Sequence, residues 1–93
     1  MISSAKQKVK EGKLVKVEVE YDEYIKRLRI TGDFFMHPED MLEKIETSMV
    51  GMKKNSRVGV IVSKIQEIAE ANDVQMIGVS PESLALVIRE ALQ

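Results

Sequence analysis

The chain has 93 residues, 44% of them hydrophobic and 31% charged, with a formal net charge of −1. This length fits a single domain over residues 1–93, and the near balance of charge argues against a nucleic-acid binder that depends on bulk positive charge. The absence of cysteine excludes thiol nucleophiles, disulfides and thiolate metal sites, and without a signal-like N-terminus or an apolar run of about 20 residues we expect a cytoplasmic protein with no membrane segment.

The first third of the chain predicts an antiparallel sheet. Over residues 13–21 valines alternate with charged side chains, which is typical of a strand with one buried face. A second strand is predicted over residues 24–31, and the register that stacks apolar on apolar side chains places Val17 opposite Leu28. Because Asp22-Glu23 is a poor two-residue hairpin turn, the geometry of the loop between these strands stays open.

An outer strand precedes this hairpin. Residues 5–10 alternate between apolar or neutral side chains and lysines, and such lysines discourage pairing with other sheets. Gly12 supplies the backbone freedom of the connecting turn. We therefore expect a three-stranded antiparallel meander with one covered face.

Three helices are predicted in the remaining two thirds of the chain. The first begins at Pro38, followed by two acidic residues that suit the first turn, and ends near Gly51. The second spans residues 58–71, although its first five residues also fit a buried strand. The third begins with Ser80 as N-cap and Pro81 at the first helical position. The predicted fold class is α+β, with three helices packed on one face of the three-stranded antiparallel meander.

Catalytic chemistry has little support in the sequence. His37 is the only histidine, and no serine or lysine lies in a motif that would activate it, so we predict no catalytic residue. Asp33, His37, Glu39 and Asp40 are four potential metal ligands, but the acidic residues fit helix capping better, and we predict no metal site. The scattered glycines form no phosphate-binding loop, so we expect this chain alone to bind no cofactor.

Both phenylalanines of the chain are adjacent, in the string Gly32-Asp33-Phe34-Phe35 at the joint between the last strand and the first helix. Adjacent side chains of an extended backbone point to opposite sides, which would send one ring into the core and the other outward. The alternative is that both rings are buried through a turn, with Gly32 allowing a bend and Asp33 bonding to nearby backbone amides. An outward ring would be a candidate anchor for a partner protein.

The string IxGDFFxxPE over residues 30–39, together with segment 12–19 and a helix ending at Gly51, resembles the accessory C-terminal domain of lipoate-protein ligases. The resemblance implies a non-catalytic small subunit that forms a heterodimer with the large catalytic subunit of a two-part ligase. Such an enzyme uses ATP and magnesium to activate lipoate to lipoyl-adenylate, and transfers the lipoyl group to a lysine of a lipoyl-acceptor domain. The substrate-binding motifs belong to the large subunit and have no match here. The residues that the resemblance assigns to partner binding are Gly32, Asp33, Phe34 and Phe35.

An alternative function is that of a general adaptor or nucleic-acid-binding module that uses the lysine-rich outer strand. The lysines lack interleaved aromatic residues, so a solvated strand face explains them better, and we predict no nucleic-acid partner. Binding to RNA or DNA with a steep salt dependence would favour the alternative.

Overall fold

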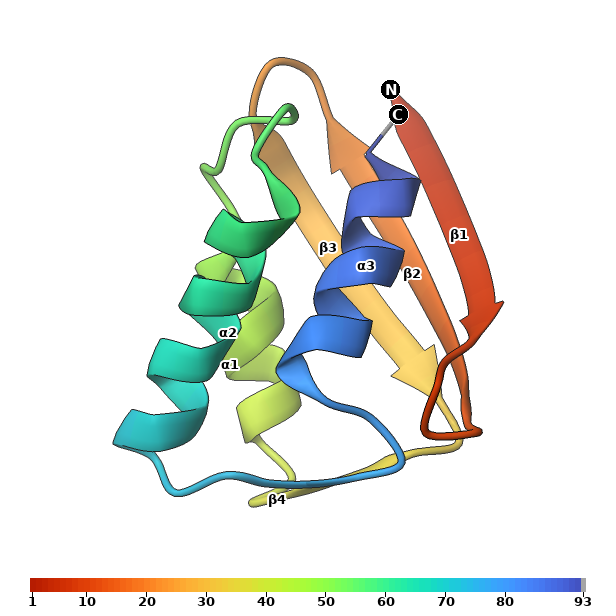
Figure 1. Cartoon of the computed structure of the whole chain (residues 1–93). Helices are drawn as coiled ribbons and strands as arrows, with labels where there is room; N and C mark the ends of the chain where they lie inside the picture. Colours follow the sequence, from red (N-terminus) through yellow and green to blue (C-terminus); the bar gives the residue numbers. More distant parts are fainter. Residues whose placement is uncertain (93) are drawn as a thin grey trace.

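One layer of the computed structural model, which describes residues 1–92, is an antiparallel sheet of three strands in the order β1-β2-β3. The strands are β1 (Ile2–Lys8), β2 (Leu14–Tyr21) and β3 (Ile25–Gly32). Three helices cover one face of this sheet and leave the other face open (Figure 1). The helices are α1 (Met41–Ser48), α2 (Val58–Ala71) and α3 (Pro81–Ala91). The predicted α+β fold is confirmed.

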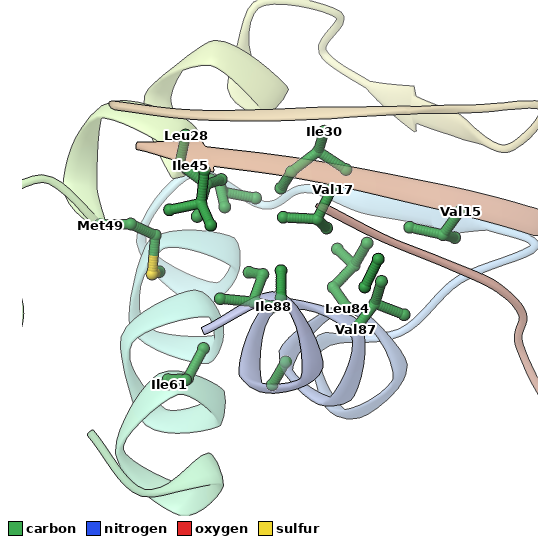
Figure 2. Close-up of a cluster of buried hydrophobic side chains, with 14 of the residues drawn as sticks. Val15, Val17, Leu28, Ile30, Ile45, Met49, Ile61, Leu84, Val87 and Ile88 are labelled. Atoms are coloured by element: carbon green, nitrogen blue, oxygen red, sulfur yellow. The ribbon is translucent and has the colours of Figure 1, made fainter. Parts of the chain in front are cut away.

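The core lies between the sheet and the helices. Helix α3 packs against β1 and β2, helix α1 packs against β3, and α2 packs against the other two helices. The alternation predicted for β2 is confirmed, because its valines are buried while the residues between them are largely exposed. Figure 2 shows Val17 and Ile30 of the sheet pointing toward Leu84 and Ile88 of α3.

The predicted register between the second and third strands is wrong by two residues. Val17 lies opposite Ile30, not Leu28. The connection is longer than a two-residue turn: the Asp22 N–H donates to the Tyr24 carbonyl at 3.1 Å, and the Tyr24 N–H donates to Asp22 Oδ1 at 3.0 Å. A bulge at the end of β2 takes up the remaining offset. Since side chains alternate with a period of two, a shift of two residues keeps every apolar residue on the covered face.

The start of the first helix also differs from the prediction. Helix α1 begins at Met41 with Asp40 as its N-cap, and Pro38 lies in the preceding turn. A short strand that was not predicted, β4 (Phe35–His37), intervenes and pairs with another, β5 (Gln75–Ile77). This pairing joins segments about forty residues apart in the sequence. A local signal for a helix start, such as proline, carries no information about such a distant partner.

The other two helices follow the sequence closely. Helix α2 has the predicted bounds, and the alternative of a buried strand at its start is wrong. Ser80 caps α3 as predicted: its Oγ accepts the Ser83 N–H at 3.1 Å, and Ser83 Oγ accepts the Ser80 N–H at 2.9 Å. None of the described helices combines the length and apolar character needed to cross a lipid bilayer.

Candidate partner-binding surface

Gly32 and Asp33 join the end of β3 to the start of β2. A Cβ on Gly32 would lie 2.2 Å from the carbonyl oxygen of Leu14, so only glycine fits this close approach between strands. Asp33 Oδ1 accepts the Leu14 N–H at 2.9 Å, and the Asp33 N–H donates to the Leu14 carbonyl at 3.3 Å. Asp33 therefore bonds to the backbone as expected, but to a residue of another strand and not to a local amide.

The two phenylalanine rings lie in different surroundings. Phe34 is partly buried and packs against the hydrophobic core. Phe35, in β4, is 70% exposed. The expectation that one ring points inward and the other outward is confirmed, and the alternative that both rings are buried is wrong.

Ile77 extends the exposed apolar surface around Phe35. It lies directly opposite Phe35 in the β4–β5 pair and is itself 62% exposed. The next pair in the ladder, Met36 and Met76, is buried and partly buried, so the small sheet turns one side to the core and the other outward. We call the exposed pair, Phe35 and Ile77, the β4–β5 patch.

Sequence reasoning identified Phe35 but missed Ile77. A strand of three residues is too short to show a periodic pattern, and segment 75–77 lies between two helices whose own signals dominate. The glycine that follows Ile77 is a usable sequence signal, because glycine often marks a turn. In the structure the φ of Gly78 is +87°, a backbone conformation that favours glycine, and it ends β5.

A shallow hollow of about 370 Å³ lies beside Phe35, between the end of β3, β4 and the start of α1. Its walls include the partly buried Phe34 and Leu42, and Glu39 contributes a carboxylate. The hollow is lined by Ile30, Thr31, Gly32, Phe34, Phe35, Met36, Glu39 and Leu42. An apolar side chain of a partner protein would meet mainly apolar walls there.

The β1–β2 turn supports the segment that follows Ile77. A Cβ on Gly78 would lie 2.4 Å from the side chain of Lys13, so the two are in close contact. Glu11, in the same turn, lies at the N-terminus of α3. Desolvation is the largest single influence on the pKa of Glu11 and raises it, but hydrogen bonds from the hydroxyls of Ser80 and Ser83 together outweigh it and hold the pKa below its ordinary value. The turn and the start of α3 are thereby joined on one side of β5.

The potential metal ligands of the sequence do not converge. Asp33 is bonded to the backbone of Leu14, Asp40 lies at the N-cap of α1, and His37 is exposed at the end of β4. No group of three or more His, Cys, Asp or Glu side chains within residues 1–92 has the arrangement of a metal site.

No protein-family model and no curated protein matches this chain. A solved structure does, from an archaeal lipoylation system described as a bi-partite lipoate protein ligase and its E2 lipoyl domain from Thermoplasma acidophilum. The two chains share 30% sequence identity and superpose with a TM-score of 0.80, over 96% of each chain. The chain belongs to the accessory-domain family of lipoate-protein ligases. The likeness of this accessory domain extends over nearly the whole fold, far beyond the string at residues 30–39, and it places the chain in protein lipoylation.

Proposed function

We propose that this chain is the non-catalytic small subunit of a two-part lipoate-protein ligase. It docks on the large catalytic subunit and supports the ATP-dependent activation of lipoate to lipoyl-adenylate. The observation that carries the proposal is the likeness, over 96% of each chain, to a chain of a bi-partite ligase system. ATP, magnesium and lipoate are bound by the complex, and the acceptor of the lipoyl group is a separate lipoyl domain.

The β4–β5 patch is the proposed docking site, together with the hollow beside it. Burying a large apolar side chain contributes about 1.5–3 kcal/mol, so Phe35 and Ile77 together contribute roughly 3–6 kcal/mol before the cost of association. These two side chains serve as anchors within a wider contact. Gly32 and Asp33 act indirectly, because the close approach of Gly32 to Leu14 and the hydrogen bonds of Asp33 to Leu14 hold the strand end from which the two phenylalanines extend.

The rate of lipoyl-adenylate formation tests the supporting role. The catalytic subunit encoded in the same genome is assayed with ATP, magnesium and lipoate, with and without this chain. We expect faster adenylate formation in its presence. Equal rates would overturn the activating role, and a failure of the two proteins to associate at micromolar concentration in calorimetry would overturn docking.

A lipoyl-acceptor role in the same system has one observation in its favour. The exposed β1–β2 turn carries Lys10 and Lys13, and an acceptor needs an accessible lysine. Mass spectrometry of the chain after incubation with the complete ligase separates the roles. The small-subunit proposal predicts no lipoyl modification on this chain, whereas a lipoylated lysine would identify an acceptor.

Substitutions in the patch test its position. Phe35→Ala with Ile77→Ala is expected to weaken binding to the catalytic subunit by at least about tenfold, which corresponds to about 1.4 kcal/mol. The matched control is Val50→Ala with Val60→Ala, since these side chains are also exposed and apolar but lie elsewhere. Equal affinities of the patch and control variants in calorimetry would place the docking site on another surface.

A further inference from the structure

The rest of the chain forms hydrogen bonds to one edge of the three-stranded sheet and leaves the other edge unpaired. On the β3 edge, the Ile25 N–H donates to the Met52 carbonyl and the Gly51 N–H donates to the Ile25 carbonyl, both at 2.8 Å. Farther along this edge, Glu46 Oε2 accepts the Ile30 N–H at 2.6 Å. The segment after α1 and a carboxylate of α1 thus occupy backbone groups that a new strand would need.

The β1 edge is open. Met1 and Tyr21 exchange both backbone hydrogen bonds, with their N–H groups donating at 2.8 and 2.9 Å. In an antiparallel pair such residues alternate with residues whose N–H and C=O point away from the partner strand. On β1 the outward-pointing residues are Ile2, Ser4, Lys6 and Lys8. Within residues 1–92, nothing pairs with these groups on the outer side.

Positive charge is concentrated beside this edge. Lys6 and Lys8 project from the open face of the sheet, and Lys6 lies directly opposite Lys16 of β2, a like-charge pair that costs free energy. The neighbour of Lys16 on β3 is Thr31, so the row Lys6–Lys16–Thr31 holds no carboxylate. The next residue on this face of β2, Glu18, lies opposite Arg29. Nearer the other end of the sheet, glutamates of β2 lie opposite arginines of β3, in the pairs Glu18–Arg29 and Glu20–Arg27.

On its covered side, the β1 edge borders a groove of about 390 Å³ against α3. Leu86 of α3 contributes to this groove and is 60% exposed. Gln7 Nε2 donates to Glu90 Oε1 at 2.9 Å, which connects β1 to α3 at the groove. An inward-pointing side chain of a strand added to β1 would enter the groove and contact Leu86.

We propose that β1 binds an extended segment of a partner protein as a fourth, antiparallel strand, and that this segment alternates acidic and apolar side chains. Its backbone pairs with the outward groups of β1, its acidic side chains lie beside Lys6 and Lys8, with Lys16 one strand farther in, and an apolar side chain contacts Leu86. This site uses residues other than the β4–β5 patch, so it stands or falls separately from the proposed docking on the catalytic subunit.

Charge selects this occupant over a second copy of the chain. Pairing β1 with another β1 would bring Lys6, Lys8 and Lys16 of both copies onto one face, with strong mutual repulsion. A nucleic acid would satisfy the lysines, but it has no backbone ladder for the N–H and C=O groups of β1 and no apolar side chain for Leu86.

A synthetic peptide tests the proposal directly. The probe is a fluorescent seven-residue peptide, as long as β1, that alternates glutamate with valine or leucine. We expect it to bind the intact chain at least about tenfold more tightly than a peptide with lysine in place of glutamate. Equal affinity for both peptides, tighter binding of a single-stranded oligonucleotide, or a dimer of the chain in sedimentation would each overturn the proposal.

Amide hydrogen exchange measured by NMR distinguishes strand addition from adhesion by charge. The N–H groups of Ala5 and Gln7 already bond to β2, whereas those of Ser4, Lys6 and Lys8 point outward. With saturating acidic peptide, we expect exchange to slow at these three outward amides and to stay unchanged at the other two. An absence of this alternation would rule out a fourth strand.

Charge reversal supplies the variant test. Lys6→Glu with Lys8→Glu is expected to weaken binding of the acidic peptide by at least about tenfold. Lys53→Glu with Lys54→Glu makes the same change in net charge beside the closed β3 edge, and it should change the affinity by less than about twofold. Ser4→Pro removes one outward N–H without removing a bond to β2, and it should also weaken binding. Equal effects of the two double variants would show that net charge alone drives the interaction.

Discussion

At the scale of single residues, position 32 requires glycine because a neighbouring strand leaves no room for a side chain. The backbone conformation at this position does not itself require glycine. The sequence suggested that this glycine allows a bend. In the structure its φ lies outside the left-handed region, and the limiting contact is the Leu14 carbonyl, 2.2 Å from the position of a Cβ. Sequence alone therefore identified the residue but not its physical reason.

Alanine substitution of two glycines tests this reason. Gly32→Ala should lower the free energy of unfolding by roughly 2 kcal/mol or more, because the backbone of two paired strands must separate. Gly59→Ala is the matched control: a Cβ there meets nothing within 4 Å, and in the helix α2 it should raise stability by about 0.5–1 kcal/mol. Urea unfolding of both variants measures the difference, and equal effects would contradict the steric explanation.

The two phenylalanines should separate stability from binding. Phe34→Ala removes a ring that packs on the core, and we expect a loss of about 2–3 kcal/mol, below the 3–5 kcal/mol typical of a fully buried ring. Phe35→Ala removes an exposed ring and should change stability by less than about 0.5 kcal/mol. Thermal unfolding checks both values. If Phe35→Ala destabilised the chain as much as Phe34→Ala, the assignment of the exposed ring to a partner would lose its basis.

At the scale of secondary-structure elements, local sequence signals predicted correctly those elements whose formation depends mainly on their own residues. The capping serine and proline predicted the start of α3, and the alternation of valines predicted β2. The β4–β5 pair was missed because its stability depends on a contact between distant segments. The register of β2 and β3 was wrong because the bulged Asp22 turn, and not the best stacking of apolar residues, determines it.

Glu46 offers a test of how α1 closes the β3 edge. Glu46→Ala leaves the Ile30 N–H without its acceptor in a partly buried position, and we expect a loss of about 1–3 kcal/mol. Glu46→Gln keeps an acceptor oxygen and should retain most of the stability. Chemical unfolding of both variants checks the order, and equal losses would show that the carboxylate charge, rather than the hydrogen bond, matters.

At the scale of the whole molecule, the sheet has one covered face, one open face, one closed edge and one open edge. Helices account for the covered face, and the segment around residues 46–53 accounts for the closed edge. On the β1 edge, the charged side chains of the lysines discourage pairing with a strand of another molecule. We therefore expect the isolated chain to remain monomeric at micromolar concentration.

Removing the lysines should change that behaviour. Lys6→Val with Lys8→Val is expected to cause self-association, because the open backbone groups would then lie beside apolar side chains. Lys53→Val with Lys54→Val makes the same chemical change beside the closed edge and should leave the chain monomeric. Sedimentation velocity measures both variants, and a monomeric Lys6 and Lys8 variant would show that another feature protects the edge.

The sequence by itself determined the α+β class, the alternation of β2 and the cap of α3. These features follow from periodicity, capping and the alternation of neighbouring side chains, which act over a few residues. For the two phenylalanine rings and for the start of α2 it left two alternatives, and the structure decided between them. Only the tertiary structure decided the register of β2 and β3, the pairing of Phe35 with Ile77 and the difference between the two sheet edges. Each of these depends on which backbone groups, far apart in the sequence, form hydrogen bonds with one another. No single segment of the chain contains that information.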